Sequence, residues 1–309
     1  MDQIPITAVF PFDSVPHLAQ SSTIGPMTYL EKLKSIQEQN NSWLCVGLDP
    51  DPQKLRVDWL KWDEPVLPFN KAIIDATADL VCAYKPNFGF YLQWGAAGII
   101  ALERTIAYIP RHIPIILDCK IGDMGHTQAA WAAGLFDEWG VDAVTVNPYL
   151  GAETVLAMVG NRPDKAVYIL SRTSNRSATD FQGDLRQGEG LAAEVLRQSQ
   201  QWPTAGHKGY VVGATYPEEL AIARQLAPEA NFLIPGIGAQ GGDLVTAVTH
   251  GPDPLAGPVI SSSRGILYAG GGPDFAEKAR TAATAVRDEI NTLRHQFALE
   301  KGLKSKQTD

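Results

Sequence analysis

The sequence predicts a (β/α)₈ barrel, the TIM-barrel fold, in a chain of 309 residues. Eight apolar runs of strand length alternate with amphipathic segments of helix length, which is the order of parallel βαβ units. Together they extend over about 250 residues, the usual size of such a barrel. A doubly wound open sheet is the alternative, but no GxGxxG motif follows the first run, and eight regular units favour the barrel.

Each predicted strand is a short apolar run, as expected of parallel strands that are covered on both faces. In chain order the strands are WLCVGLD (43–49), LVCAYKP (80–86), IPIILDCK (113–120), AVTVN (143–147), AVYILSR (166–172), GYVVGA (209–214), NFLIP (231–235) and PVISSS (258–263).

The segments between these strands have apolar residues at helical spacing. They predict helices over residues 69–80, 89–109, 127–140, 151–160, 190–202, 216–227 and 241–250, and a long helix that begins at Phe275. The first 25 residues contain three prolines and no sustained periodicity. We therefore expect residues 1–25 to be an N-terminal extension and residues 26–309 to form a single barrel domain.

The composition excludes several classes of protein. Hydrophobic residues make up 45% of the chain and charged residues 19%, which is typical of a soluble globular protein, and no apolar run approaches the length of a membrane span. The formal charge of -8 argues against a nucleic-acid-binding protein. The three cysteines, Cys45, Cys82 and Cys119, lie in apolar runs, so we interpret them as core residues. A cytoplasmic location is the default expectation.

Polar residues follow the predicted strands at the end where barrel enzymes carry their active sites. The first strand ends in Asp49, the second in Lys85 and Asn87, and the third in Asp118 and Lys120. The fourth strand ends in Asn147, the fifth in Arg172, Thr173, Ser174 and Asn175, the seventh in PGIGAQGGD and the eighth in SSSRG.

Asp118 and Lys120 are two positions apart in the third strand, so strand alternation predicts that both face the mouth of the barrel while Cys119 faces away. A structural ion pair is the alternative interpretation. Because Asp49 and Lys85 reach the same rim from neighbouring strands, we expect two acids and two lysines to meet in one pocket. Carboxylates keep such lysines protonated, and a protonated lysine is an acid that can quench a carbanion.

A metal site is less attractive at this pocket. Ammonium groups among the carboxylates compete for the charge that a cation would neutralise, and no pair of histidines has ligand spacing. His126, which lies near the cluster in sequence, is interpreted as a polar loop residue.

The loops after the seventh and eighth strands predict a phosphate site. Glycines at positions 236, 238, 241 and 242 expose backbone N–H groups ahead of a helix, and Arg264 follows one strand later. The guanidinium of Arg264 can bind a phosphate through two hydrogen bonds.

LDCKIGDMGHT, Leu117 to Thr127, resembles the Asp-x-Lys-x-x-Asp signature of the orotidine 5′-phosphate decarboxylases, and PGIGAQGGD with the terminal arginine loop resembles their phosphate site. With GLDPD, YKPN and RTSN in the same order, the chain is similar to the longer, second-type bacterial form over most of residues 27–272. Met124 stands where the family commonly has Ile.

The resemblance implies roles for the charged residues. Lys120 would donate a proton to C6 of the pyrimidine after CO₂ leaves, and Asp118 would lie against the substrate carboxylate. Lys85 and Asp123 would complete the charge network, and Asp49 and Lys85 would hold ribose hydroxyls. No cofactor is implied.

The resemblance also implies the remaining substrate contacts. Asp123 and Thr127 would enter the neighbouring subunit's site across a homodimer interface. Gln240 and Arg264 would bind the phosphate as the loop after the seventh strand closes, and Thr173 or Ser174 would face the pyrimidine. Asn147, at the end of the fourth strand, is a further candidate for substrate binding.

Two other functions stay open at this point. An Mg²⁺-dependent sugar-phosphate decarboxylase of the same suprafamily would share Asp-x-Lys-x-x-Asp, although the GAQGGD loop and the pair Asp49 and Lys85 argue against it. A barrel without activity would only bind nucleotides or a partner, and the intact charged residues argue against that.

Overall fold

The computed structural model describes residues 27–55, 64–184, 190–215, 217–237 and 243–305. The predicted N-terminal extension, residues 1–25, and Gln240 with its neighbouring glycines at 238, 241 and 242 lie outside this part of the chain.

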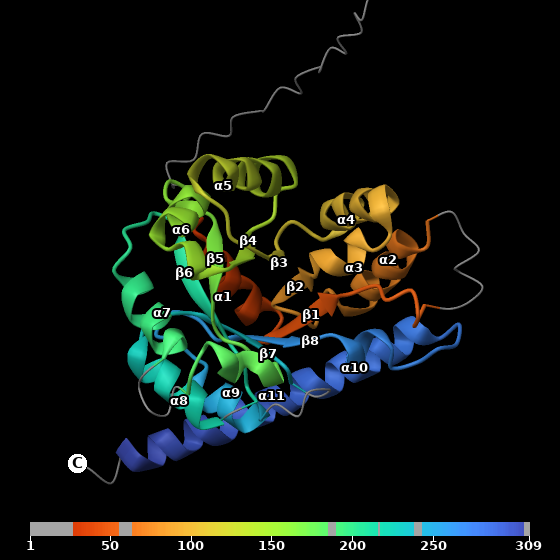
Figure 1. Cartoon of the computed structure of the whole chain (residues 1–309). Helices are drawn as coiled ribbons and strands as arrows, with labels where there is room; N and C mark the ends of the chain where they lie inside the picture. The colour runs from red at the N-terminus through yellow and green to blue at the C-terminus, as the bar shows by residue number, and fades with distance from the viewer. Residues whose placement is uncertain (1–26, 56–63, 185–189, 216, 238–242, 306–309) are drawn as a thin grey trace, which may run out of the picture.

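Within the described residues, eight parallel strands form one sheet in the order β2-β1-β8-β7-β6-β5-β4-β3. Bridges from Tyr84 to Ile115 and from Asn87 to Asp118 join β2 to β3, so the sheet closes into a barrel. Figure 1 shows the helices around the strands, and the predicted (β/α)₈ barrel is confirmed. The strands are β1 (Leu44–Leu48), β2 (Ala83–Pro86), β3 (Ile116–Ile121), β4 (Ala143–Val146), β5 (Ala166–Arg172), β6 (His207–Val212), β7 (Phe232–Pro235) and β8 (Val259–Ser262).

Most helices lie where the apolar spacing predicts them. They include α2 (Val66–Thr77), α6 (Ala152–Val159), α7 (Leu191–Gln200), α8 (Pro217–Leu226) and α9 (Leu244–His250). The short α10 (Arg264–Leu267), which follows β8, was not predicted.

Two predicted helices are interrupted. The segment 89–109 forms α3 (Phe88–Leu92) and α4 (Gly95–Tyr108), because Gly95 has a φ of 63°, which a continuous right-handed helix does not contain. The segment 127–140 begins as α5 (Gly125–Ala132) and continues as a π-helix over Ala133–Glu138. A 3₁₀ turn, Pro148–Leu150, follows β4, and another, Arg176–Asp180, follows β5.

Helix α1 (Tyr29–Gln39) precedes the first strand and is absent from the predicted elements. Its sequence signal is a capping box: the Thr28 side chain accepts from the Glu31 N–H, and the Glu31 carboxylate accepts from the Thr28 N–H at 2.7 Å. The helix buries Tyr29, whose hydroxyl lies 2.9 Å from that of Tyr168 in β5. This contact anchors α1 to the barrel.

Helix α11 (Phe275–Ser305) is the long C-terminal helix predicted from Phe275. It packs against α2, α9, α10 and β1, and Figure 1 shows it running along one side of the barrel. Arg280 on α11 binds Asp79 through two hydrogen bonds of 2.7 Å, which ties the helix to the end of α2. In the part of the chain described, no helix is long and apolar enough to cross a membrane.

Candidate active site

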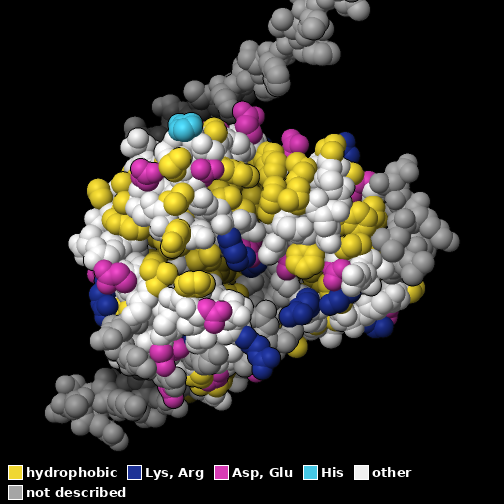
Figure 2. Space-filling model, in the orientation of Figure 1, with side chains coloured by type: hydrophobic (Ala, Val, Ile, Leu, Met, Phe, Trp, Pro, Cys, Tyr) yellow, Lys and Arg dark blue, Asp and Glu magenta, His cyan; other side chains and the backbone are white. Residues whose placement is uncertain are grey.

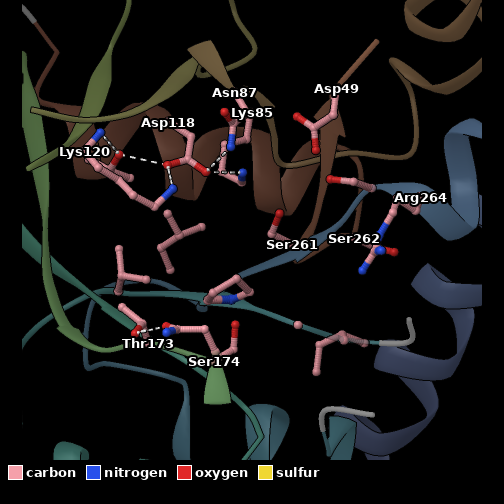
Figure 3. A pocket seen from close by; sticks show the side chains of 18 of the residues that line it. Asp49, Lys85, Asn87, Asp118, Lys120, Thr173, Ser174, Ser261, Ser262 and Arg264 are labelled. Carbon is pink, nitrogen blue, oxygen red and sulfur yellow. Dashed lines mark hydrogen bonds and ion pairs between the residues drawn. The ribbon is translucent and has the colours of Figure 1, made fainter. Parts of the chain in front are cut away.

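The carboxyl ends of the strands surround a cavity of about 770 Å³. Figure 2 shows the molecule hollowed at the centre of this face, with lysine and arginine side chains around the opening, and Figure 3 shows the cavity from close by. Its position is where barrel enzymes hold their substrates. The lining contains seven residues predicted from the sequence: Asp49, Lys85, Asp118, Lys120, Thr173, Ser174 and Arg264.

The carboxylate of Asp118 is the centre of a hydrogen-bond network. Lys120 Nζ lies 2.6 Å from Oδ1, and the Thr145 hydroxyl donates to the same oxygen at 3.0 Å. Lys85 Nζ lies 2.9 Å from Oδ2, and the side-chain amide of Asn87 donates to that oxygen at 3.3 Å. Three strands and the start of α3 therefore place four donors around one carboxylate (Figure 3).

These contacts decide the charges of the network. Burial by itself disfavours ionisation of Asp118, but the ammonium groups of Lys85 and Lys120 hold the pKa of this carboxyl well below its usual range. Burial also disfavours the charged form of Lys85, yet the carboxylates of Asp118 and Asp49 raise the pKa of Lys85 above its ordinary value. Asp118 and Lys85 therefore stabilise each other in their ionised forms.

The two lysines differ in access. The Lys85 side chain is 7% exposed and the Lys120 side chain 48% exposed, although both bind Asp118. A molecule in the cavity can reach the Lys120 ammonium without displacing Asp118, whereas the Lys85 side chain is mostly buried in the cavity wall. Of these two lysines, Lys120 is the one suited to transfer a proton to a ligand.

Strand β3 is irregular at the charged residues. The register of β3 with β4 shifts between Leu117 and Ile121, and Lys120 has a φ of 47°, in the left-handed region that residues with a side chain rarely adopt. Asp118 and Lys120 both line the cavity, as predicted, but simple alternation along a regular strand is not the reason. The bulge aims the Lys120 side chain.

Asp49 lies at the end of β1 and is 8% exposed. Burial raises the pKa of its carboxyl, while Lys85 counteracts this shift. The Ser263 side chain and the Asn87 backbone also lower this pKa, and Oδ1 of the carboxylate is buried without a hydrogen-bond partner among the described residues. A buried acceptor of this kind suits a ligand hydroxyl, which can donate to it.

The opposite side of the cavity in Figure 3 carries Arg264, beside Ser262 and Ser261 of β8. Arg264 is exposed and begins α10, and Gly236, which follows β7, lines the same cavity. The predicted pairing of the loops after β7 and β8 therefore holds for the described part of these loops. The arrangement offers a guanidinium and hydroxyl donors to an anion.

The loop after β5 supplies Thr173 and Ser174 to the cavity. Gln182 holds Thr173 through two hydrogen bonds: its Oε1 accepts from the Thr173 N–H at 2.9 Å, and its Nε2 donates to the Thr173 hydroxyl at 2.8 Å. Arg172, which the sequence places with these residues, is buried away from the cavity lining and forms an ion pair with Glu219 of α8.

Asp123, Thr127 and Asn147 do not line the cavity of their own chain. Asp123 and Thr127 are partly exposed at the start of α5, and the Asp123 carboxylate accepts from the Met124 N–H at 2.8 Å. The Asn147 side chain accepts from the Tyr149 N–H at 3.0 Å and thereby caps the 3₁₀ turn after β4. Their predicted roles toward the substrate stay predictions.

Asn87 is named among the polar strand ends but has no predicted role, and Thr145 and Gln182 are absent from the predicted site residues. Asn87 had a signal, because it directly follows the strand that carries Lys85. Thr145 had a weaker one, as the polar residue within the apolar run of β4. Gln182 had none, since its contact with Thr173 depends on the path of the loop.

Comparison with known proteins agrees with this geometry. A family model described as orotidine 5′-phosphate decarboxylase / HUMPS family matches residues 42–279. The orotidine 5′-phosphate decarboxylase of Thermomicrobium roseum is 47% identical over 281 residues, which cover 89% of this chain and 99% of that protein. The corresponding protein of Cellvibrio japonicus is 45% identical over 276 residues, covering 87% of this chain and 100% of that protein. The structure of the Leishmania donovani OMP decarboxylase superposes with a TM-score of 0.74 at 33% identity, covering 87% of this chain and 99% of that one.

Proposed function

The chain belongs to the orotidine 5′-phosphate decarboxylase / HUMPS family and converts orotidine 5′-phosphate (OMP) to UMP and CO₂ without a cofactor, and we propose that Lys120 is the acid of this reaction. This places the enzyme in pyrimidine biosynthesis. The observation that carries the assignment of Lys120 is that its ammonium is open to the cavity while it binds the Asp118 carboxylate at 2.6 Å.

The reaction breaks the bond between C6 of the pyrimidine and its carboxylate. Carbon dioxide leaves, the electron pair stays on C6, and this carbanion takes a proton from Lys120 Nζ, which solvent then restores. Asp118 lies against the substrate carboxylate, and repulsion between the two carboxylates destabilises the bound substrate. The ammonium of Lys120 stabilises the negative charge that develops at C6. The network around Asp118 holds both groups in place before the substrate arrives.

Asp49 and Lys85 bind the ribose hydroxyls in this proposal. The support is the buried Oδ1 of Asp49, which has no partner among the described residues and accepts a hydrogen bond from a hydroxyl. Lys85 lies between Asp49 and Asp118, so its ammonium links the ribose end of the site to the reacting end.

Arg264 and Gln240 both bind the substrate phosphate. Arg264 lies on the other side of the cavity from Lys120 in Figure 3, which allows one nucleotide to span both residues. Thr173 or Ser174 contacts the pyrimidine from the loop after β5, and Asn147 remains a candidate contact. The binding energy of the phosphate, which is remote from the bond that breaks, is available to position the pyrimidine.

The enzyme acts as a homodimer in which Asp123 and Thr127 reach the partner's site. Two observations support this assembly. Neither residue lines its own cavity, and large apolar side chains are exposed near them: Met124 at 59%, Tyr149 at 84% and Leu150 at 44%. An exposed apolar surface of this kind suits a second copy of the chain. The enzyme works in the cytoplasm.

The test of this function is decarboxylation of OMP by the purified protein in EDTA, followed as the loss of substrate absorbance. Full activity in EDTA is expected. Strict dependence on Mg²⁺ would point instead to the sugar-phosphate decarboxylases of the same suprafamily. Tight binding of UMP without any turnover would identify a nucleotide-binding barrel that has lost its activity.

A further inference from the structure

Thr145 is the residue that faces the bulge of β3 from the neighbouring strand. Leu117 pairs with Val144, and the next pair is Ile121 with Val146. Three residues of β3 therefore lie opposite a single residue of β4. On the β4 side the regular pairing is interrupted over these three residues, and Thr145 is the β4 residue that lies across from them.

The Thr145 hydroxyl makes two hydrogen bonds within this bulge. It accepts from the Lys120 backbone N–H at 2.9 Å and donates to Oδ1 of Asp118 at 3.0 Å. Lys120 Nζ lies 2.6 Å from the same Oδ1. One hydroxyl thus holds the backbone of Lys120 and also the carboxylate that binds its ammonium.

The backbone of Lys120 needs such a restraint. Its φ of 47° lies in the left-handed region, which a residue with a side chain occupies only when its surroundings enforce it. Thr145 is 1% exposed, so water does not compete for its hydroxyl. Its β-branched side chain also has restricted rotamers, which keeps the hydroxyl in position.

We propose that Thr145 is a positioning residue for the decarboxylation: its hydroxyl fixes the bulge of β3 and so aims the Lys120 ammonium at C6. This inference rests on the proposed role of Lys120 as the acid. Thr145 contributes to the rate through Lys120 and Asp118, and the affinity for the nucleotide depends on other residues.

The test compares Thr145→Val, which keeps the shape but removes the hydroxyl, with Thr145→Ser, which keeps the hydroxyl. We expect kcat for OMP to fall about 10- to 100-fold in Thr145→Val, because small displacements of a reacting group have effects of this size. The Kd of UMP should stay within about twofold of the wild-type value, and Thr145→Ser should recover most of kcat. Thr145→Ala serves as a second hydroxyl-free variant if the valine variant does not fold.

Thr77→Val is the matched control. Thr77 is also a buried threonine with two hydrogen bonds, to the Ile73 carbonyl and the Tyr84 hydroxyl, but it lies on α2 outside the cavity lining. Its kcat should be that of the wild type even if its stability falls. A wild-type kcat in folded Thr145→Val or Thr145→Ala overturns the inference, as does an equal loss of kcat in Thr145→Ser. Failure of the proposed function is a different result, because then the wild-type protein itself does not turn over OMP.

Discussion

The ammonium of Lys120 lies 2.6 Å from the carboxylate of Asp118, which is two positions earlier in the same strand. In a regular strand, side chains two positions apart point to the same face, and the backbone of both residues has the usual extended conformation. Here the register shift of β3 and the positive φ of Lys120 bring them together at the cavity. Local distortion of one strand therefore places the proposed acid beside its counter-charge, and the predictions below follow from this arrangement and its surroundings.

Replacing Lys120 by alanine should abolish turnover but retain nucleotide binding. We expect kcat for Lys120→Ala to fall by at least about 10⁴-fold, since the variant loses both the acid and the cation that stabilises the carbanion. Asp118 keeps Lys85 as a partner, so the fold and the affinity for UMP should be largely retained. Absorbance assays give kcat and calorimetry gives the Kd of UMP.

The control for this variant is Lys71→Ala. Lys71 also has a defined contact, with its ammonium 4.4 Å from the Tyr108 ring centroid, but it lies on α2 outside the cavity lining. Its activity should equal that of the wild type. Near-normal turnover by Lys120→Ala would disprove the proposed role.

Mixing two inactive variants should restore activity if Asp123 acts across a dimer interface. In a heterodimer of Asp123→Asn and Lys120→Ala chains, one of the two sites has both native residues. With random exchange of subunits we expect about a quarter of the wild-type activity. The measurement is turnover after subunit exchange, with exchange itself verified by differently tagged chains. Complete exchange without recovery would mean that Asp123 acts within its own chain.

Replacing Arg264 should affect only substrates that carry a phosphate. For Arg264→Ala we expect kcat/KM on OMP to fall roughly 10- to 100-fold, the effect of losing charge-assisted hydrogen bonds. Turnover of orotidine, which lacks the phosphate, should not change. Arg280→Ala, which removes the surface ion pair with Asp79, is the control and should change the turnover of neither substrate. An equal loss on both substrates would place Arg264 elsewhere in the mechanism.

The partly buried His207 should make the fold sensitive to mild acid. Its ring stacks on Tyr29, its Nε2 is buried, and burial lowers the pKa of the imidazole to about 4. The unfolded chain, with an ordinary histidine pKa of about 6.5, takes up the proton first as the pH falls. Stability should therefore decrease between about pH 6.5 and pH 4, by up to about 3 kcal/mol from this residue.

Denaturant unfolding at several pH values measures this effect. In His207→Gln the free energy of unfolding should vary less over the same pH range. An exposed histidine, His112, provides the control, and His112→Gln should behave as the wild type. If His207→Gln and the wild type show the same pH dependence, His207 does not carry the effect.

The sequence by itself determined the barrel, the positions of its strands and most of the charged residues of the site. Strands buried on both faces leave unbroken apolar runs, and the residues that end those runs must meet at one rim because the strands are parallel. Asp49, Lys85, Asp118, Lys120 and Arg264 could be found in this way. Helix α1 had a readable signal as well, in the capping box of Thr28 and Glu31.

Only the tertiary structure decided how the site is held. Contacts between segments far apart in the chain decide four features of the site. Two concern Lys120: its positive φ and the hydrogen bond from its N–H to the Thr145 hydroxyl. The others are the hydrogen bond from the Gln182 amide to Thr173 and the ion pair that holds Arg172 on Glu219. Local periodicity carries no information on such contacts, because which atoms meet is set by the register and twist of neighbouring strands and by the paths of the loops. The residue types of the site can therefore be predicted from the sequence, whereas their geometry is a property of the folded barrel.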